Sequence, residues 1–330
     1  MSSTLRPAEA NDPIDFGKVG PDMQDGSPRK SMPTVAVVVA TLGRPHIVAA
    51  TVSYLLQVQT LKPAVVIVSC TRLEDAGDAA GLPNVQVVVG APGLPAQRNR
   101  GLAALPKGID VVVFFDDDFV PEAHWIAAAA QAFRDEPTIV AFTGEVLADG
   151  IKGPGLAFQQ AVRIVESADR RPAPSRVEPF SPYGCNMAFR LSAISGITFD
   201  ERLVLYGWLE DRDFGATLAR RGGRLVKCGT ALGVHMGVKG GRVAGDRLGY
   251  SQVVNPIYML RKGTMTRAQV AGQIFRNVAS NVARAFMPEP FIDRRGRLRG
   301  NLLGLVDVFK GRLEPERAAA INPRRNPRER

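Results

Sequence analysis

The chain has 330 residues, of which 45% are hydrophobic and 22% are charged, a composition that excludes a mainly disordered or collagen-like protein. Its net charge is +10, and residues 291–330 alone carry eleven basic and five acidic residues. A basic tail of this kind suits an anionic membrane surface, nucleic acid or simple solubility. We do not expect nucleic acid, because no aromatic residue is interleaved with the arginines of residues 294–299.

The sequence contains no pattern for a membrane span, a signal peptide or a disulfide framework. No run approaches the roughly 18 apolar residues that a span needs, and residues 1–32 lack an apolar segment. The three cysteines, Cys70, Cys185 and Cys228, include no CxxC pair. We therefore expect a cytoplasmic protein whose residues 1–32 form a flexible leader.

Short apolar runs alternate with helical segments in the first third of the chain. Buried strands are predicted at 34–41, 64–70, 85–90 and 109–118, and helices at 46–58 and 96–105. Because the strands are apolar throughout, both faces of their sheet should be covered. This pattern predicts an α/β fold with a Rossmann-like, mostly parallel sheet flanked by helices.

Helices and strands continue to residue 229, and a helical C-terminal extension follows. Helices are predicted at 124–135, near 157–169 and at 210–222, and strands at 138–147 and 224–229. In residues 267–287, apolar side chains recur every three or four positions and predict an amphipathic helix, with three arginines beside its apolar face. That face packs on the domain or docks on anionic lipids. The apolar positions are Val270, Ile274, Phe275, Val278, Val282 and Phe286.

Three adjacent carboxylates, Asp116, Asp117 and Asp118, follow the fourth predicted strand directly. Ligands of open parallel sheets bind at the carboxyl ends of the strands. The three carboxylates repel one another, and a hard divalent cation such as Mg²⁺ or Mn²⁺ would compensate them. The alternative is a solvated acidic turn.

Four segments occur in an order and spacing that resemble family 2 glycosyltransferases with the GT-A fold: VAVVVATLGRP, GLPAQRNRGL, VVFFDDDFVP and LEDRDFGATLARRGGRL. The resemblance covers about residues 33–240. It implies a GT-A domain over 33–245, with a nucleotide-binding half at 33–120, an acceptor half at 121–245 and the helical, basic extension at 246–330. The segment GRLRGNLLGLVDVFKGRLEPER resembles the tail of bacterial members that build surface polysaccharides.

The resemblance implies an inverting, metal-dependent transferase that moves a sugar from a nucleotide-sugar donor to a glycan or lipid-linked acceptor. Asp211 would be the general base, with Glu210 as the second choice. Asp118, Asp116 and His235 would hold Mn²⁺ or Mg²⁺. The nucleotide sugar would be bound by Thr41, Arg44, Arg98, Asn99, Asp116, Asp117 and Gly184.

Some features leave alternatives open. Without the resemblance, Glu210 and Asp211 would simply complement the dipole of their helix. The glycine-rich loop with Lys239, Arg242 and Arg247 would either close over the diphosphate or be a solvated surface loop.

One departure from the family pattern supports a different function. Ser69 and Cys70 stand where many relatives have an acidic pair, with Glu74 and Asp75 only later. This keeps open a catalytically inactive nucleotide-sugar-binding or scaffold protein of the same fold. The expected location is the cytoplasm, with peripheral attachment to the inner face of the cell membrane if the C-terminal helix docks there.

Overall fold

The computed structural model describes residues 31–168, 176–178, 181–240, 243–287 and 289–322. The chain divides into residues 1–31 and a compact unit that begins at Met32, and the fold below is that of the compact unit. Except for its last two residues, the predicted leader lies outside the described part of the chain.

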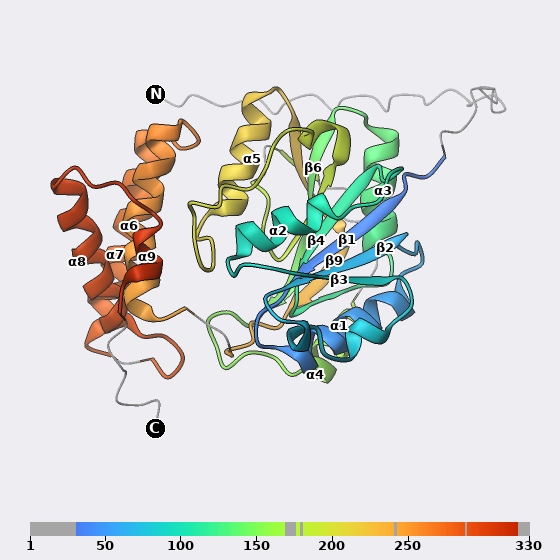
Figure 1. The fold of residues 1–330 in the computed structure, drawn as a ribbon, viewed down its shortest axis with the longest axis horizontal. Coiled ribbons are helices and arrows are strands. Elements are labelled where there is room, and N and C mark those ends of the chain that lie inside the picture. Colours follow the sequence, from blue (N-terminus) through green and yellow to red (C-terminus); the bar gives the residue numbers. More distant parts are fainter. Residues whose placement is uncertain (1–30, 169–175, 179–180, 241–242, 288, 323–330) are drawn as a thin grey trace, which may run out of the picture. The chain divides into compact units, whose positions relative to one another are not determined.

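One sheet forms the centre of the unit, with strand order β3-β2-β1-β4-β8-β6-β9-β5 and with β7 paired to β9 (Figure 1). The strands are β1 (Val35–Ala40), β2 (Val65–Cys70), β3 (Val85–Val89), β4 (Val111–Asp116), β5 (Phe119–Pro121), β6 (Ile139–Asp149), β7 (Arg176–Val177), β8 (Asn186–Arg190) and β9 (Arg224–His235). Within the group β1 to β4, every strand pairing is parallel. β8 joins β4 to β6 in antiparallel pairing, so the second half of the sheet is mixed.

Alternate side chains of the parallel strands enter two different cores, as a sheet covered on both faces requires. Val37 and Val113 pack with α1 (Pro45–Val58), α3 (Trp125–Asp135) and the 3-10 segment η1 (Leu73–Gly81). On the other face, Val38, Val112 and Phe114 pack with α2 (Leu94–Ala103), α5 (Glu210–Arg220) and η2 (Leu191–Ile194). α4 (Phe158–Glu166) closes a smaller cluster with β5 and β9. The predicted α/β, Rossmann-like fold is therefore confirmed.

The C-terminal region is helical, as predicted. It contains α6 (Gly245–Lys262), α7 (Arg267–Ala285), α8 (Arg294–Phe309) and the short α9 (Arg317–Ala320), and the three long helices pack on one another (Figure 1). α6 and α8 approach so closely that a Cβ on Gly300 would lie 2.0 Å from the Asp246 carbonyl oxygen. Among the described helices, none combines the length and the apolar content that crossing a bilayer would demand.

Two predicted strand ends were wrong, and both lie near the acidic cluster. β4 stops at Asp116, because Asp117 and Asp118 form a turn that leads into β5. β9 continues to His235 rather than ending at residue 229. The physical reason is pairing with β5 and β6, which supplies partners for the backbone beyond the predicted end.

Candidate functional site

Strand pairing brings His235 to the acidic cluster. β5 pairs antiparallel with β9 in the register Phe119 to His235, and the Met236 N–H donates to the Asp118 carbonyl at 2.9 Å. The His235 ring therefore faces two of the carboxylates. Its Nε2 lies 3.3 Å from Asp118 Oδ1 and 3.9 Å from Asp116 Oδ2.

Asp116, Asp118 and His235 form a group that fits a divalent cation. One ligand atom of each lies within 4.8 Å of the others. Two carboxylate oxygens and one imidazole nitrogen suit Mn²⁺, and Mg²⁺ accepts the carboxylates. The structure therefore brings the three predicted ligand residues together.

A second layer of contacts orients His235. Its Nδ1 lies 3.0 Å from Asp149 Oδ1, and the other Asp149 oxygen accepts the Tyr183 hydroxyl at 2.7 Å. A carboxylate on one ring nitrogen leaves the other nitrogen directed at the ligand position, which is the usual arrangement around metal-binding histidines. The sequence analysis missed Asp149 and Tyr183. The only local signal was an acidic residue two positions beyond the end of the strand predicted at 138–147.

Burial and neighbouring charges shift several pKa values in this cluster. Burial would lower the pKa of His235, but hydrogen bonds to Asp118 and Asp149 raise it to about 10. Burial raises the pKa of Asp117 to about 7 although Arg44 opposes the shift. The His235 shift reflects its two carboxylate partners, and the Asp117 shift reflects burial first and the neighbouring aspartates after it. Burial would raise the pKa of Asp118, but hydrogen bonds from His235 and the Val238 N–H and the charge of Arg44 outweigh it and lower the pKa.

Asp117 points to different partners from those of Asp116 and Asp118. It accepts hydrogen bonds from Thr41 Oγ1 at 2.7 Å and from Arg44 Nη1 at 2.8 Å. Arg44 also donates through Nε to the Gly240 carbonyl at 2.8 Å, so it ties the glycine-rich loop to the acidic turn. The structure thus brings together three of the predicted nucleotide-binding residues.

Arg98 links the acidic turn to the start of α5. It is only 2% exposed, and it donates through Nη2 to Asp116 Oδ1 at 3.1 Å and to the Gly184 carbonyl at 2.8 Å. Its Nη1 pairs with Glu210 Oε1. Burial alone would lower the pKa of Arg98, but Glu210 and Asp116 reverse this and raise it. Arg98 is therefore a buried cation between acidic groups.

Glu210 and Asp211 stand side by side but have different surroundings. Glu210 is 3% exposed and is committed to Arg98, whereas Asp211 is half-buried. Asp211 accepts the Gly184 N–H at 2.8 Å on Oδ2 and the Arg212 N–H at 2.7 Å on Oδ1. A Cβ on Gly184 would lie 3.2 Å from Asp211 Oδ2, so a side chain at this position would crowd both Asp211 and Arg98.

A strained turn sets the start of α5. Leu205 and Leu209 have φ values of 63° and 72°, in the left-handed region that costs a non-glycine residue roughly 1–2 kcal/mol. Gly207 lies between them with φ 62°, and its carbonyl accepts the Glu210 N–H at 2.7 Å. Strain of this kind gathers at functional sites.

Several predicted contributors lie elsewhere. Asn99 binds the backbone of Phe199 and the carboxylate of Glu201 (2.8 Å), and it takes no part in the acidic cluster. Lys239 donates to the Gly150 carbonyl at 2.8 Å, and Arg247 donates to the Ile321 carbonyl at 2.9 Å. Arg242 lies outside the described residues.

Two further polar residues stand at the carboxyl ends of β1 to β3. Asp75 is buried and accepts the N–H of Gly43 at 3.0 Å and the hydroxyl of Thr71 at 2.8 Å. It therefore braces the loop that carries Arg44. Arg100 donates to the Ala91 carbonyl at 2.8 Å beside the ends of β2 and β3. The motif AQRNRGL contained this arginine, but nothing in the sequence showed where it would point.

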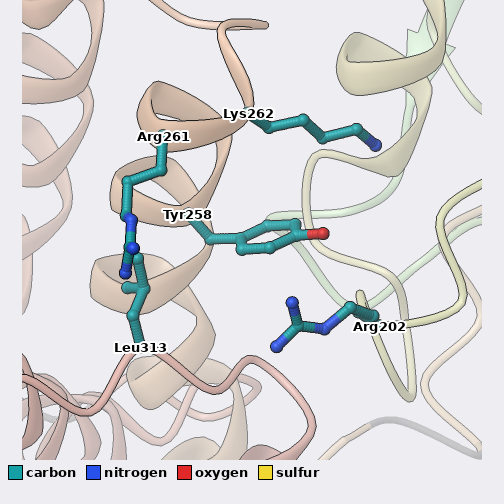
Figure 2. A pocket seen from close by; sticks show the side chains of 5 residues that line it. All are labelled: Arg202, Tyr258, Arg261, Lys262 and Leu313. Atoms are coloured by element: carbon teal, nitrogen blue, oxygen red, sulfur yellow. The ribbon is translucent and has the colours of Figure 1, made fainter.

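A separate hollow of about 350 Å³ lies beside α6 and is lined by basic and aromatic side chains (Figure 2). Lys262 pairs there with Asp200 at 2.7 Å and Asp213 at 2.6 Å, and Arg202 pairs with Glu316 at 2.6 Å. These carboxylates neutralise two of its three cations, so we assign no ligand to it. The lining residues are Arg202, Tyr258, Arg261, Lys262 and Leu313.

No protein-family model matches the sequence, and no curated protein matches it. The site contains the Asp116, Asp118 and His235 group, whose ligand atoms lie close enough together for a metal ion, and a half-buried carboxylate, Asp211, which accepts the Gly184 N–H.

Proposed function

We propose that the protein is an inverting, metal-dependent glycosyltransferase. It would transfer a sugar from a nucleotide-sugar donor to a glycan or lipid-linked acceptor in bacterial surface polysaccharide synthesis. The observation that carries the proposal is the meeting of Asp116, Asp118 and His235 at the carboxyl edge of the parallel strands, where ligands of such sheets bind. The motif resemblance supports the same reaction.

The metal would be Mn²⁺ or Mg²⁺, held by Asp116, Asp118 and His235. It supplies Lewis-acid stabilisation of the charge that develops on the diphosphate leaving group. The protein contributes the ligand positions, and Asp149 holds the His235 ring in place. Thr41 and Arg44 fix Asp117 and with it the turn that carries the two ligand aspartates.

Asp211 is the proposed general base. The acceptor hydroxyl oxygen bonds to the anomeric carbon from the face opposite the diphosphate, and the carbon–oxygen bond to the diphosphate breaks. The hydroxyl proton passes to a carboxylate oxygen of Asp211, which has lone pairs beyond those used by Gly184 and Arg212. Burial raises the pKa of Asp211, which makes it a stronger base. Glu210 is a positioning residue that acts through Arg98.

A second candidate is a protein of the same fold that binds a nucleotide sugar without transferring it. Ser69 and Cys70, in place of an acidic pair, favour it. Asp75 is poorly placed to take over the role of that acidic pair, because both of its carboxylate oxygens already accept hydrogen bonds from Gly43, Thr71 and Arg72.

Donor turnover tests the proposal. The full-length protein is incubated with Mn²⁺ and a panel of nucleotide sugars, and release of nucleoside diphosphate is measured. We expect release with one donor class, a loss of about a hundredfold or more in Asp118→Asn, and no loss in the exposed control Asp78→Asn. Circular dichroism checks the fold of each variant.

The other outcomes are distinct. Thermal stabilisation by a nucleoside diphosphate without any turnover would favour the non-catalytic candidate. Neither binding nor turnover with any donor would contradict both. Activity in Asp118→Asn equal to the wild type would remove Asp118 from the proposed site.

A further inference from the structure

α7 and α8 each present an apolar face outward. Phe275 and Phe286, at α7 and its C-terminal cap, are 73% and 82% exposed, and Phe309 at the end of α8 is 88% exposed. Val282 lies between the first two, and Leu302 and Val306 precede Phe309, at spacings that place each set on one side of its helix. A surface helix of a globular protein normally buries such a face.

The opposite faces contain buried polar side chains. Asn281 of α7 and Asn301 of α8 are both completely buried. Asn281 Nδ2 donates to Asn301 Oδ1 at 2.8 Å and to Gln252 Oε1 of α6 at 2.9 Å, and Asn301 Nδ2 donates to the Gly249 carbonyl at 2.7 Å. The helices therefore contact one another through buried amides and glycines as well as through apolar side chains such as Val270 and Tyr250, while Phe275, Phe286 and Phe309 stay outside.

Reversing this orientation of the helices would cost free energy. Gly249 of α6 has no room for a side chain, since a Cβ there would lie 2.0 Å from the Arg297 carbonyl oxygen. Buried Asp307 accepts the Tyr250 hydroxyl at 3.1 Å and pairs with Arg312 at 3.1 Å. Turning α8 to bury Phe309 would strip Asn301 and Asp307 of these partners, and buried polar groups without partners are strongly disfavoured. Within the part of the chain that the structure describes, these apolar faces stay uncovered.

The charge around these faces indicates what covers them. α7 contains three arginines and no acidic residue, and α8 contains four arginines and one acidic residue, the buried Asp307. Arg267 and Arg276 lie on α7, and exposed Arg295 lies at the start of α8. A second copy bound through the same face would set arginines against arginines. Arg284 and Arg294 already pair with Glu289, and Arg299 pairs with Asp246. Anionic lipid headgroups would neutralise Arg267, Arg276 and Arg295 instead, while the apolar side chains enter the acyl boundary.

We propose that α7 and α8 dock the protein on an anionic membrane surface, with Phe275, Phe286 and Phe309 inserted below the headgroups. In this proposal α7 and α8 lie parallel to the bilayer plane, since none of the described helices is long and apolar enough to cross it. The inference stands independently of the sugar-transfer proposal. It would bring a lipid-linked acceptor to the same surface if that proposal holds.

Vesicle sedimentation of the full-length protein tests the docking. The probes are vesicles of phosphatidylcholine alone and of equimolar phosphatidylcholine and phosphatidylglycerol. We expect the wild type to sediment with the anionic vesicles. Binding should fall at least about tenfold in the triple variant Phe275→Ser/Phe286→Ser/Phe309→Ser. The matched control is Leu73→Ser/Leu147→Ser, which alters exposed apolar residues outside these helices and should bind like the wild type.

The charge is tested separately. Arg267→Gln and Arg276→Gln should each weaken binding to anionic vesicles by about fivefold at low salt. Circular dichroism and thermal melting check that every variant folds. Failure of the wild type to bind anionic vesicles, or undiminished binding by the triple variant, would overturn the proposal. A concentration-dependent dimer in ultracentrifugation, lost in the triple variant and accompanied by no vesicle binding, would overturn it in favour of a second copy.

Discussion

His235 Nε2 lies 3.3 Å from Asp118 Oδ1 because β9 runs antiparallel to the short β5 that follows the acidic turn. Asp118 and Asp149 flank the ring and raise the pKa of His235 to about 10, so they favour a proton at this contact. A divalent cation would take the place of that proton. The relationship leads directly to tests of metal binding.

Removing the imidazole should weaken binding of Mn²⁺ while leaving the fold intact. We expect Mn²⁺ at a hundredfold excess over its Kd to stabilise the wild type by about 2.7 kcal/mol. The shift in Tm should largely vanish in His235→Gln. His124→Gln, at a partly exposed histidine that starts α3, is the matched control and should keep the shift. Equal shifts in the wild type and His235→Gln would exclude His235 as a ligand.

Asp149→Asn tests the outer contact of His235. The ligand side chains are retained, but the carboxylate that orients the ring is lost, so affinity for Mn²⁺ should fall by about 10–100-fold. The rate of nucleoside-diphosphate release, measured over a range of Mn²⁺ concentrations, gives this affinity. Because Asp149 acts by positioning, high Mn²⁺ should restore the rate. A loss that no concentration of Mn²⁺ rescues would count against this role.

Asp211→Asn and Glu210→Gln should fail in different ways. Asp211→Asn should lower kcat by about 10²–10⁴-fold with a modest fall in Tm, because the base is lost and the single amide oxygen can accept only one of the two N–H bonds that Asp211 takes from Gly184 and Arg212. Glu210→Gln should lower the free energy of unfolding by about 1.5–3 kcal/mol, since buried Arg98 loses one of its two carboxylate partners and keeps only Asp116. Denaturant unfolding and steady-state kinetics on both variants separate these effects.

The pH dependence of kcat provides a further check on the same residue. The base must be ionised, so the rate of the wild type should rise with pH through the raised pKa of Asp211 and then level off. Asp211→Asn should lack this rise. The same rise in both proteins would assign the base to another group.

Asp200 should stabilise the protein in a pH-dependent way. It accepts hydrogen bonds from Lys262 Nζ at 2.7 Å and the Tyr258 hydroxyl at 2.8 Å, which together connect α6 to the chain before α5. Burial raises the pKa of Asp200, but the bonds from Lys262 and Tyr258 outweigh it and lower the pKa. The stabilisation is therefore present above the ordinary pKa near 3.9 and is lost as the pH falls through the lowered value.

Asp200→Asn should lower the free energy of unfolding by about 1 kcal/mol at neutral pH. The difference from the wild type should shrink below about pH 4. Urea unfolding at both pH values measures it, with Asp78→Asn as the exposed control. A difference that persists unchanged in acid would mean that the ion pair is not its source.

The amino-acid sequence by itself determined the α/β class, the parallel strands and the position of the acidic cluster at a strand end. Strands covered on both faces must be apolar throughout, and that pattern is visible without any tertiary contact. The sequence did not reveal α6 or α8 as separate helices, because glycines and buried amides interrupt the apolar periodicity on their inner faces. The roles of the site residues remain predictions.

Only the tertiary structure decided which polar groups meet. Pairing of β5 with β9 and of β6 with β9 places Asp118, His235 and Asp149 together, although they come from three distant segments. Burial commits Glu210 to Arg98 and leaves Asp211 accessible. The outward orientation of Phe275 and Phe309 depends on the buried amides and glycines between α6, α7 and α8. Such contacts between distant segments leave no trace in the local periodicity of a sequence.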